Sequence, residues 1–303
     1  MYSPNDRLYF SEAYRLASSF TRVANCIGGN HFDSAKSYAL LKKIRGDEPM
    51  RYETLSPTLD SGLGSRARIG LIVLRSDQTI EFEARQIFAH LSGTALYQSR
   101  IYNEFQINPD TLMAMKPLIP EAARLLPVPW NFVSIGFACT SAAMLIGDDP
   151  IVELIHQVHP EVAVSNPVNA CVQAFKALDV KRIAVITPYS RMVNESIAAG
   201  LEARGLEIPV FVSFEEPDDN IVAKISEQSV AEAARKAAAD DQVEGVFISC
   251  TSIRAVSFIA DLEKEIGKPV TSSNHAILWH LIRLAGLDDS LPQFGRLYTQ
   301  PIR

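Results

Sequence analysis

Short apolar runs alternate with amphipathic helical segments along most of this 303-residue chain. The run Ile69–Leu74 is continuous, as in a parallel strand that is covered on both faces. The segment Ile80–Leu91 follows it and places its apolar side chains on one helical face. The same succession recurs up to a last helix expected over 274–284. Strands that alternate with helices predict an α/β fold with parallel sheets and helices on both faces.

The second half of the chain repeats the order of elements found in the first half. This match predicts two pseudo-symmetric parallel-sheet α/β lobes. We expect the first lobe over residues 50–165, with a closing helical segment over 274–303, and the second lobe over residues 166–273. Because ligands bind beyond the carboxyl ends of parallel strands, the active site should lie in the cleft between the lobes.

Residues 1–49 lack the strand alternation of the remainder and form a mixed polar stretch. Two interpretations of this extension stay open. Either Met50 is the true start of the protein, or the extension is an added helical arm that packs on a partner. In both cases we expect low order there, as is common at chain termini. We also expect the protein to form a homo-oligomer.

Two of the strand-like runs end in the same tripeptide, Cys-Thr-Ser. The first comprises Cys139, Thr140 and Ser141, and the second, 111 positions later (250 minus 139), comprises Cys250, Thr251 and Ser252. A thiol at the end of a strand and before a helix lies near backbone N–H groups, which lower its pKa. Two such thiols on opposite faces of a substrate carbon act as base and acid, or one adds covalently to the substrate. The hydroxyls beside them, with that of Tyr189, are donors suited to the charge of an enediolate.

Composition and charge exclude several classes of function. Cys26 and Cys171 lack the repeated motif and are interpreted as small buried apolar residues. There is no Cys-x-x-Cys pair and no Cys/His cluster at metal spacing, so we expect neither a metal nor a disulfide scaffold. A net charge of −6 argues against a nucleic-acid partner. No apolar run has membrane-spanning length and the N-terminus is not signal-like, which predicts a cytoplasmic protein with no membrane partner.

Two further polar residues follow predicted strands and are candidates for substrate binding. Asp77 lies in the loop after the first strand, where its carboxylate either binds substrate or caps the helix that begins near Ile80. Asn166 ends another strand and either donates to the substrate or caps the next helix. Both roles stay open for each residue.

These motifs resemble those of the aspartate/glutamate racemase superfamily. The resemblance covers Arg68 to Leu287 and rests on four separated motifs: 74–81, 138–141, 187–189 with Val193 and Asn194 after it, and 249–252. The chain is most similar to the branch that holds maleate cis–trans isomerase, arylmalonate decarboxylase and the racemase-like ectoine-utilisation proteins.

This resemblance implies a cofactor-independent isomerase with its site between two lobes. In the racemases two cysteines exchange a proton across the α-carbon, which implies this role for Cys139 and Cys250. In maleate isomerase the first cysteine adds to the double bond instead. The decarboxylases keep only the second cysteine, so the presence of Cys139 argues against decarboxylation. By the same resemblance, Tyr189, Thr140 and Ser141 would bind the substrate carboxylate.

One departure from the branch concerns the substrate. Maleate isomerases resemble each other in having asparagine at the position of Asp77. An aspartate repels a dicarboxylate and favours an ammonium group. We therefore predict a racemase or isomerase acting at the α-carbon of a small amino or diamino acid, in ectoine or hydroxyectoine degradation. Maleate-type cis–trans isomerisation through Cys139 is the alternative, and a non-catalytic two-lobed binding protein is a third interpretation.

Overall fold

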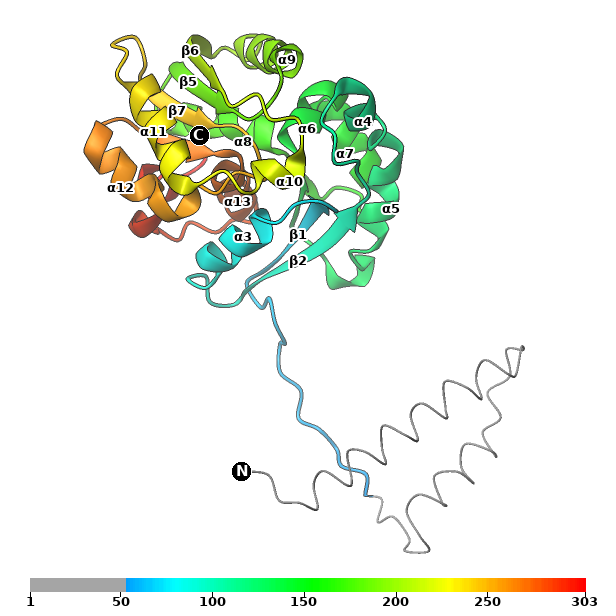
Figure 1. Cartoon of the computed structure of the whole chain (residues 1–303). Helices are drawn as coiled ribbons and strands as arrows, with labels where there is room; N and C mark the ends of the chain where they lie inside the picture. The colour runs from blue at the N-terminus through cyan, green and yellow to red at the C-terminus, as the bar shows by residue number, and fades with distance from the viewer. Residues whose placement is uncertain (1–52) are drawn as a thin grey trace, which may run out of the picture. The chain divides into compact units, whose positions relative to one another are not determined.

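The computed structural model describes residues 53–303, and the predictions made for residues 1–49 lie outside this part of the chain. Residues Leu59–Arg303 form one compact unit that contains two four-stranded parallel sheets. These sheets and the helices around them confirm the predicted α/β fold (Figure 1). The lobe boundaries at 50–165 and 166–273 stay a prediction.

The first sheet has the strand order β2-β1-β3-β4. Its strands are β1 (Ala67–Leu74), β2 (Thr94–Ile101), β3 (Ser134–Ala138) and β4 (Ala163–Ser165). All three neighbouring pairs are parallel. The central strand β1 buries Leu71, Ile72 and Val73 completely, as its continuous apolar run predicts.

The second sheet repeats this arrangement with the order β6-β5-β7-β8. Its strands are β5 (Arg182–Thr187), β6 (Glu207–Ser213), β7 (Gly245–Ile248) and β8 (Val270–Ser272). All three pairs are again parallel. In both sheets the third strand lies beside the first, so β3 and β7 occupy equivalent places. The two Cys-Thr-Ser motifs therefore begin at equivalent points of the two sheets.

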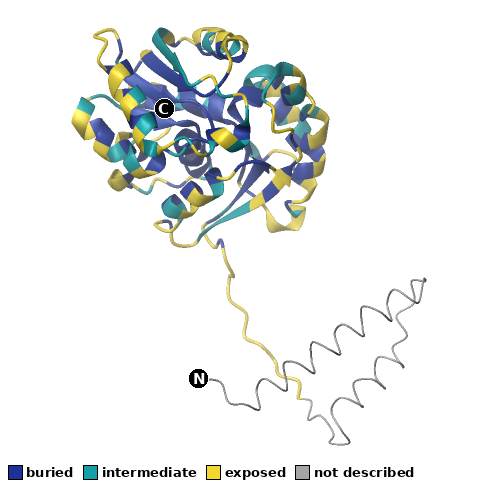
Figure 2. Cartoon of the chain, viewed as in Figure 1, coloured by how far each residue is buried: buried dark blue, intermediate teal, exposed yellow. Residues whose placement is uncertain are grey.

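Helices lie on the sheets and connect the strands; the inner strands β1, β3, β5 and β7 are almost wholly buried, whereas the edge strands β2 and β6 are mostly half-buried (Figure 2). The helices of the first half are α3 (Ile80–Phe88), α4 (Pro109–Met113), α5 (Ile119–Arg124), α6 (Thr140–Ile146) and α7 (Asp148–His156). Those of the second half are α8 (Pro167–Ala177), α9 (Arg191–Glu202), α10 (Asp219–Val222), α11 (Glu227–Ala238), α12 (Val256–Ile266) and α13 (Ser273–Leu284).

The last helix, α13, packs on the first sheet although it follows the last strand of the second. It approaches β3 closely because Gly136 has no side chain. A Cβ atom built on Gly136 would lie 2.8 Å from Leu281 Cδ1 and 2.9 Å from Leu71 Cδ1. The Ser134 hydroxyl donates to the Leu281 carbonyl across the same contact. The strand that leads to Cys139 is thus held by α13 as well as by its sheet.

Two short helices were not predicted as separate elements, and both lie at the site described below. The first is α6, which begins directly after Cys139, and the second is α10, which begins at Asp219. The sequence also predicts a helix over 111–126 that is interrupted at Pro117 and Pro120, and the structure divides this segment into α4, a short 3₁₀ turn over 116–118, and α5. Its prolines occupy the first turns of the later pieces, where their missing N–H group costs nothing.

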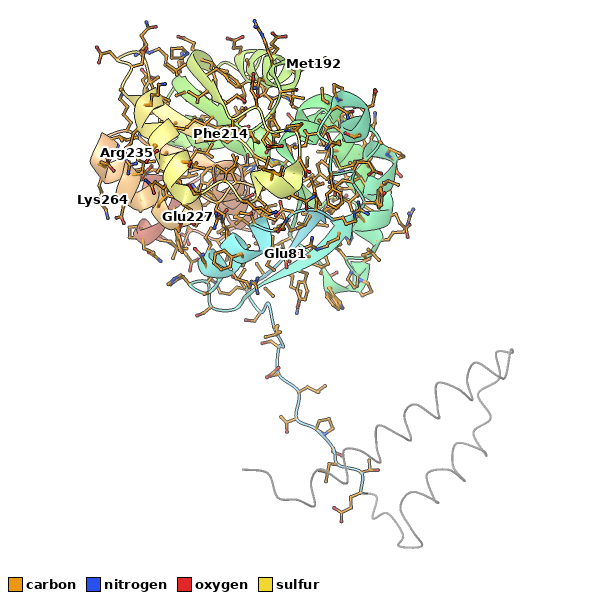
Figure 3. All side chains as sticks on the ribbon, in the orientation of Figure 1. Glu81, Met192, Phe214, Glu227, Arg235 and Lys264 are labelled. Atoms are coloured by element: carbon orange, nitrogen blue, oxygen red, sulfur yellow. The ribbon has the colours of Figure 1, made fainter. Side chains whose placement is uncertain are left out.

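Charged side chains of the second half project from α11 and α12 at the surface (Figure 3). Arg235 pairs with Glu265 at 2.6 Å and Lys264 pairs with Asp261 at 2.8 Å. Exposed pairs of this kind contribute about 0–1 kcal/mol each. The fold therefore depends mainly on its buried apolar clusters rather than on these pairs.

Candidate active site

A small enclosed cavity brings both Cys-Thr-Ser motifs together. Its lining includes Cys139, Ser141, Tyr189, Cys250 and Thr251. Cys139 follows β3, Cys250 lies two residues after β7, and Tyr189 lies two residues after β5. These residues meet because the carboxyl ends of parallel strands share one edge of each sheet. The cavity measures about 20 Å³, which holds about one water molecule, so a substrate enters only if lining groups move.

Cys139 is the N-cap residue of α6. Its sulfur lies 3.8 Å from the Ser141 hydroxyl, and the Ala142 N–H group stabilises its thiolate form. The next residue, Thr140, directs its hydroxyl away, donating to the Ser273 hydroxyl at 2.7 Å. The helix start therefore gives Cys139 the backbone donor that its sequence position predicts.

Cys250 has a different environment, because residues 251–255 separate it from α12. The Tyr189 hydroxyl and the Ser252 N–H group both stabilise its thiolate form. The Tyr189 hydroxyl also interacts with that of Ser141. Side chains thus connect the two thiols in the order Cys139, Ser141, Tyr189 and Cys250.

The prediction that these two thiols have a lowered pKa is wrong for the arrangement that the structure shows. Burial raises the pKa of Cys139 to about 12, and the Ala142 N–H and Ser141 hydroxyl groups only partly oppose this. Burial also raises the pKa of Cys250, and the negative charge of Asp219 adds to the effect. Removing a thiolate from water costs more free energy here than the few donors return. Both sulfurs are therefore thiols in this arrangement.

Asp77 caps α3 and also acts on the site electrostatically. Its Oδ1 atom accepts the N–H groups of Thr79 and Ile80 at 2.8 and 2.9 Å. Its Oδ2 atom is buried without a hydrogen bond of ordinary geometry to any residue between 53 and 303. Burial raises the pKa of Asp77 to about 6, although the two N–H groups and the Thr251 hydroxyl lower it. Thr251 lies near this carboxylate without forming a hydrogen bond of ordinary geometry to its Oδ2 atom.

Asp219 is a site residue that the sequence did not indicate. It lines the cavity and is only 4% exposed. Its Oδ1 atom accepts the Ser252 hydroxyl at 2.7 Å, and its Oδ2 atom accepts the Ser76 hydroxyl in a short contact. Asn103 in turn donates to the Ser76 hydroxyl at 2.9 Å. Asp219 therefore links the loops after β1 and β7.

An isolated antiparallel β-bridge joins residues 105–107 to residues 217–219 at the cavity. Gln106 and Asp218 are antiparallel partners in it. The Ile107 N–H group donates to the Pro217 carbonyl at 3.1 Å, and the Asp219 N–H group donates to the Phe105 carbonyl at 3.2 Å. Both segments contribute lining residues, Gln106 and Ile107 from one and Asp219 from the other. The bridge thus places Asp219 at the cavity.

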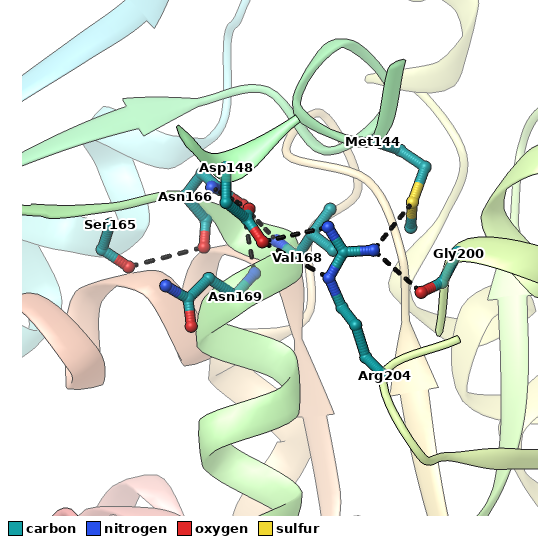
Figure 4. Close-up of polar contacts among 8 residues, drawn as sticks. All are labelled: Met144, Asp148, Ser165, Asn166, Val168, Asn169, Gly200 and Arg204. Atoms are coloured by element: carbon teal, nitrogen blue, oxygen red, sulfur yellow. Dashed lines mark hydrogen bonds and ion pairs between the residues drawn. The ribbon is translucent and has the colours of Figure 1, made fainter. Parts of the chain in front are cut away.

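Asn166 does not line the cavity, in contrast to what its position after a strand suggested. Its side-chain oxygen caps α8 by accepting the N–H groups of Val168 and Asn169. Its amide nitrogen donates to Asp148 at 2.7 Å, and Asp148 pairs with Arg204 at 2.9 Å (Figure 4). The capping role predicted as one alternative is therefore present. Both the oxygen and the nitrogen of the Asn166 side chain have protein partners.

Within residues 53–303, no group of three or more His, Cys, Asp or Glu side chains is arranged to hold a metal ion. The same part of the chain contains the free thiols Cys139, Cys171 and Cys250. Cys171 is fully buried in α8 among apolar residues, apart from the cavity lining. None of the described helices has the length and apolar character needed to cross a membrane.

Comparison with known proteins agrees with this geometry. The profile of the family described as arylmalonate decarboxylase matches residues 120–298, which is more than half of the chain. The chain belongs to the arylmalonate decarboxylase family. An arylmalonate decarboxylase from Bordetella bronchiseptica is 31% identical over 135 residues, covering 44% of this chain and 56% of the relative.

Longer matches are to proteins named maleate isomerase. The one from Nocardia farcinica is 28% identical over 245 residues, covering 77% of this chain and 96% of the relative. A solved structure of the maleate cis–trans isomerase from the same organism superposes with a TM-score of 0.70 at 27% identity, covering 77% of this chain and 98% of that one. That structure is of a Cys-to-Ser variant with a covalently bound succinylcysteine intermediate. These relatives support an isomerase and favour the cis–trans alternative over the amino-acid racemase, and none of them is an ectoine-utilisation protein.

Proposed function

We propose that this protein is a cofactor-independent isomerase that performs cis–trans isomerisation of a small unsaturated acid, with Cys139 as nucleophile and Cys250 as proton donor. The observation that carries the proposal is that both thiols line one cavity together with Ser141 and Tyr189. The relatives named maleate isomerase support the reaction type.

Cys139 first gives its proton to solvent, and the steps that follow return Cys139 to the thiolate form and Cys250 to the thiol form. The Cys139 thiolate forms a C–S bond to one carbon of the double bond, and the π pair moves to the neighbouring carbon and its carboxylate. Cys250 gives its proton to that neighbouring carbon. Rotation about the new single bond follows. Cys250 then takes the proton back, the double bond re-forms in the trans arrangement, and Cys139 leaves as a thiolate.

Tyr189 and Ser141 are the donors that stabilise the carboxylate as it gains enediolate character. Both line the cavity beside the thiols. Tyr189 also stabilises the Cys250 thiolate that exists after proton donation, because its hydroxyl interacts with that sulfur. Thr140 and Ser252 act less directly, since their hydroxyls are engaged by Ser273 and Asp219.

Racemisation of a small amino acid is a second candidate, and the carboxylates of Asp77 and Asp219 near both thiols favour it. In that reaction one thiolate removes the α-proton and the other thiol donates a proton to the opposite face. After one turnover the two sulfurs have exchanged their protonation states. Proton exchange with solvent must then restore the starting thiolate and thiol. Degradation of ectoine or hydroxyectoine stays a prediction from the sequence resemblance.

Proton NMR in deuterated buffer separates these candidates over a panel of unsaturated acids and amino acids. Cis–trans isomerisation converts the vinyl signals of an unsaturated acid, whereas racemisation exchanges the α-proton of an amino acid for deuterium. The wild type should isomerise a member of the first group, and Cys139→Ala should abolish this.

Cys171→Ala is the matched control, because Cys171 is a buried thiol outside the cavity lining. It should retain the wild-type rate. Retention of the reaction in both Cys139→Ala and Cys250→Ala would exclude the two-thiol mechanism.

A further inference from the structure

The lining of the cavity that contains the two thiols has acidic but no basic side chains. None of its lining residues is Lys, Arg or His, while Glu104 and Asp219 both line it. Glu104 is exposed and accepts the Tyr102 hydroxyl at 2.8 Å, so water screens its charge. Asp219 is buried, which leaves its charge much less screened.

Two arginines beside the loop after β1, Arg75 and Arg100, are engaged elsewhere. Arg100 donates to the carbonyls of Leu74, Arg75 and Asp77 and pairs with Glu81 at 2.9 Å. The guanidinium group of Arg75 lies over the rings of Tyr102 and Phe105. Neither guanidinium is therefore placed to neutralise a second carboxylate of a substrate in the cavity.

Both side-chain oxygens of Asp219 act as hydrogen-bond acceptors. Each of its oxygens accepts one serine hydroxyl, Ser252 on Oδ1 and Ser76 on Oδ2. A carboxylate oxygen accepts two hydrogen bonds, so each oxygen keeps one free site. Asp77 does not line the cavity, but it is a second buried carboxylate close enough to raise the pKa of both thiols, and its Oδ2 has no partner of ordinary geometry in the described chain.

We propose that Asp219 is a specificity-determining residue that binds a protonated amine of the substrate, with the charge of Asp77 in support. The preferred substrate is then a small acid that carries an ammonium group, rather than a dicarboxylate. This inference rests on the proposed two-thiol isomerase and specifies its substrate class.

The substrate ammonium also has an effect on the thiols. Asp219 and Asp77 both raise the pKa of Cys139 and of Cys250. A cation bound between these carboxylates and the sulfurs cancels that effect and stabilises a thiolate. A second carboxylate in the same place would act in the opposite direction. The charge of the substrate therefore decides both its binding and the ionisation of the nucleophile.

Matched ligand pairs test the proposal without a variant. Alanine and propionate differ by one ammonium group, as do 2-aminobutyrate and butyrate, and maleate provides the dicarboxylate. Titration calorimetry at pH 8 with the wild type should show the amine-bearing member of each pair binding about 10- to 100-fold more tightly, the effect of one charged hydrogen bond. Equal affinity within each pair, or tighter binding of maleate, would overturn the proposal.

Asp219→Asn should remove the preference for the amine, and Glu104→Gln should leave it unchanged because Glu104 is the exposed acid of the lining. If Asp219→Asn does not fold, the ligand pairs on the wild type still decide.

An amine preference with no isomerisation of any compound would refute the proposed reaction but not the amine site. Isomerisation of maleate through Cys139 without an amine preference would refute the amine site but not the reaction.

Discussion

The two thiols follow equivalent strands, yet the regions that come after them differ. Cys139 is followed at once by α6 and receives the Ala142 N–H group, whereas residues 251–255 separate Cys250 from α12. The charge of Asp219 raises the pKa of both thiols, but at Cys250 its effect exceeds that of each donor, whereas at Cys139 the Ala142 N–H and Ser141 hydroxyl groups, which lower the pKa, each outweigh it. A repeated motif in a pseudo-symmetric fold therefore yields unequal thiols: the first is better suited to be the nucleophile and the second to be the proton donor.

The largest changes in isomerisation rate are expected when each thiol is replaced by a hydroxyl. Cys139→Ser removes the nucleophile and should lower the isomerisation rate by at least about 10⁴-fold. Cys250→Ser removes a general acid and should lower it by about 10²- to 10⁴-fold, the smaller of the two losses. Steady-state rates measured at one pH give the comparison, and equal losses would argue for interchangeable thiols.

The dependence of KM on pH tests whether the charge of Asp77 acts on substrate binding. Burial raises the pKa of Asp77 to about 6, so this carboxyl is neutral below that pH and charged above it. For an amine-bearing substrate, KM should therefore rise as the pH falls through about 6, by roughly 10-fold at pH 5. Asp77→Asn should remove this limb of the profile. Parallel KM profiles for variant and wild type between pH 5 and 8 would show that Asp77 does not act on binding.

The smallest effect is expected at Asn166, which caps α8 beside the Asp148–Arg204 pair. Asn166→Ala loses the cap and should lower the free energy of unfolding by about 1 kcal/mol, measured by urea denaturation. Its kcat/KM should change less than about twofold, because the amide does not line the cavity. A drop in kcat/KM without a loss of stability would restore the substrate-binding role predicted from the sequence.

The alternation of apolar runs and helices was sufficient to predict the two sheets, because buried parallel strands such as β1 and β5 have a composition that few other elements share. The short helices α6 and α10 were missed since neither is long enough to show a helical period, and Asp219 was missed with α10. A position after a strand predicted backbone donors for Cys139 correctly, but not its pKa. That value depends on how completely the two halves bury the sulfur, which no local pattern records.

Mapping the covalent adduct tests the division of roles between the two thiols most directly. Cys250→Ser, incubated with the isomerised compound and quenched in acid, should carry the mass of one substrate on the peptide that contains Cys139. Cys139→Ser treated in the same way should carry none. An adduct on Cys250 in Cys139→Ser, or no adduct on Cys139 in Cys250→Ser under turnover conditions, would contradict the account.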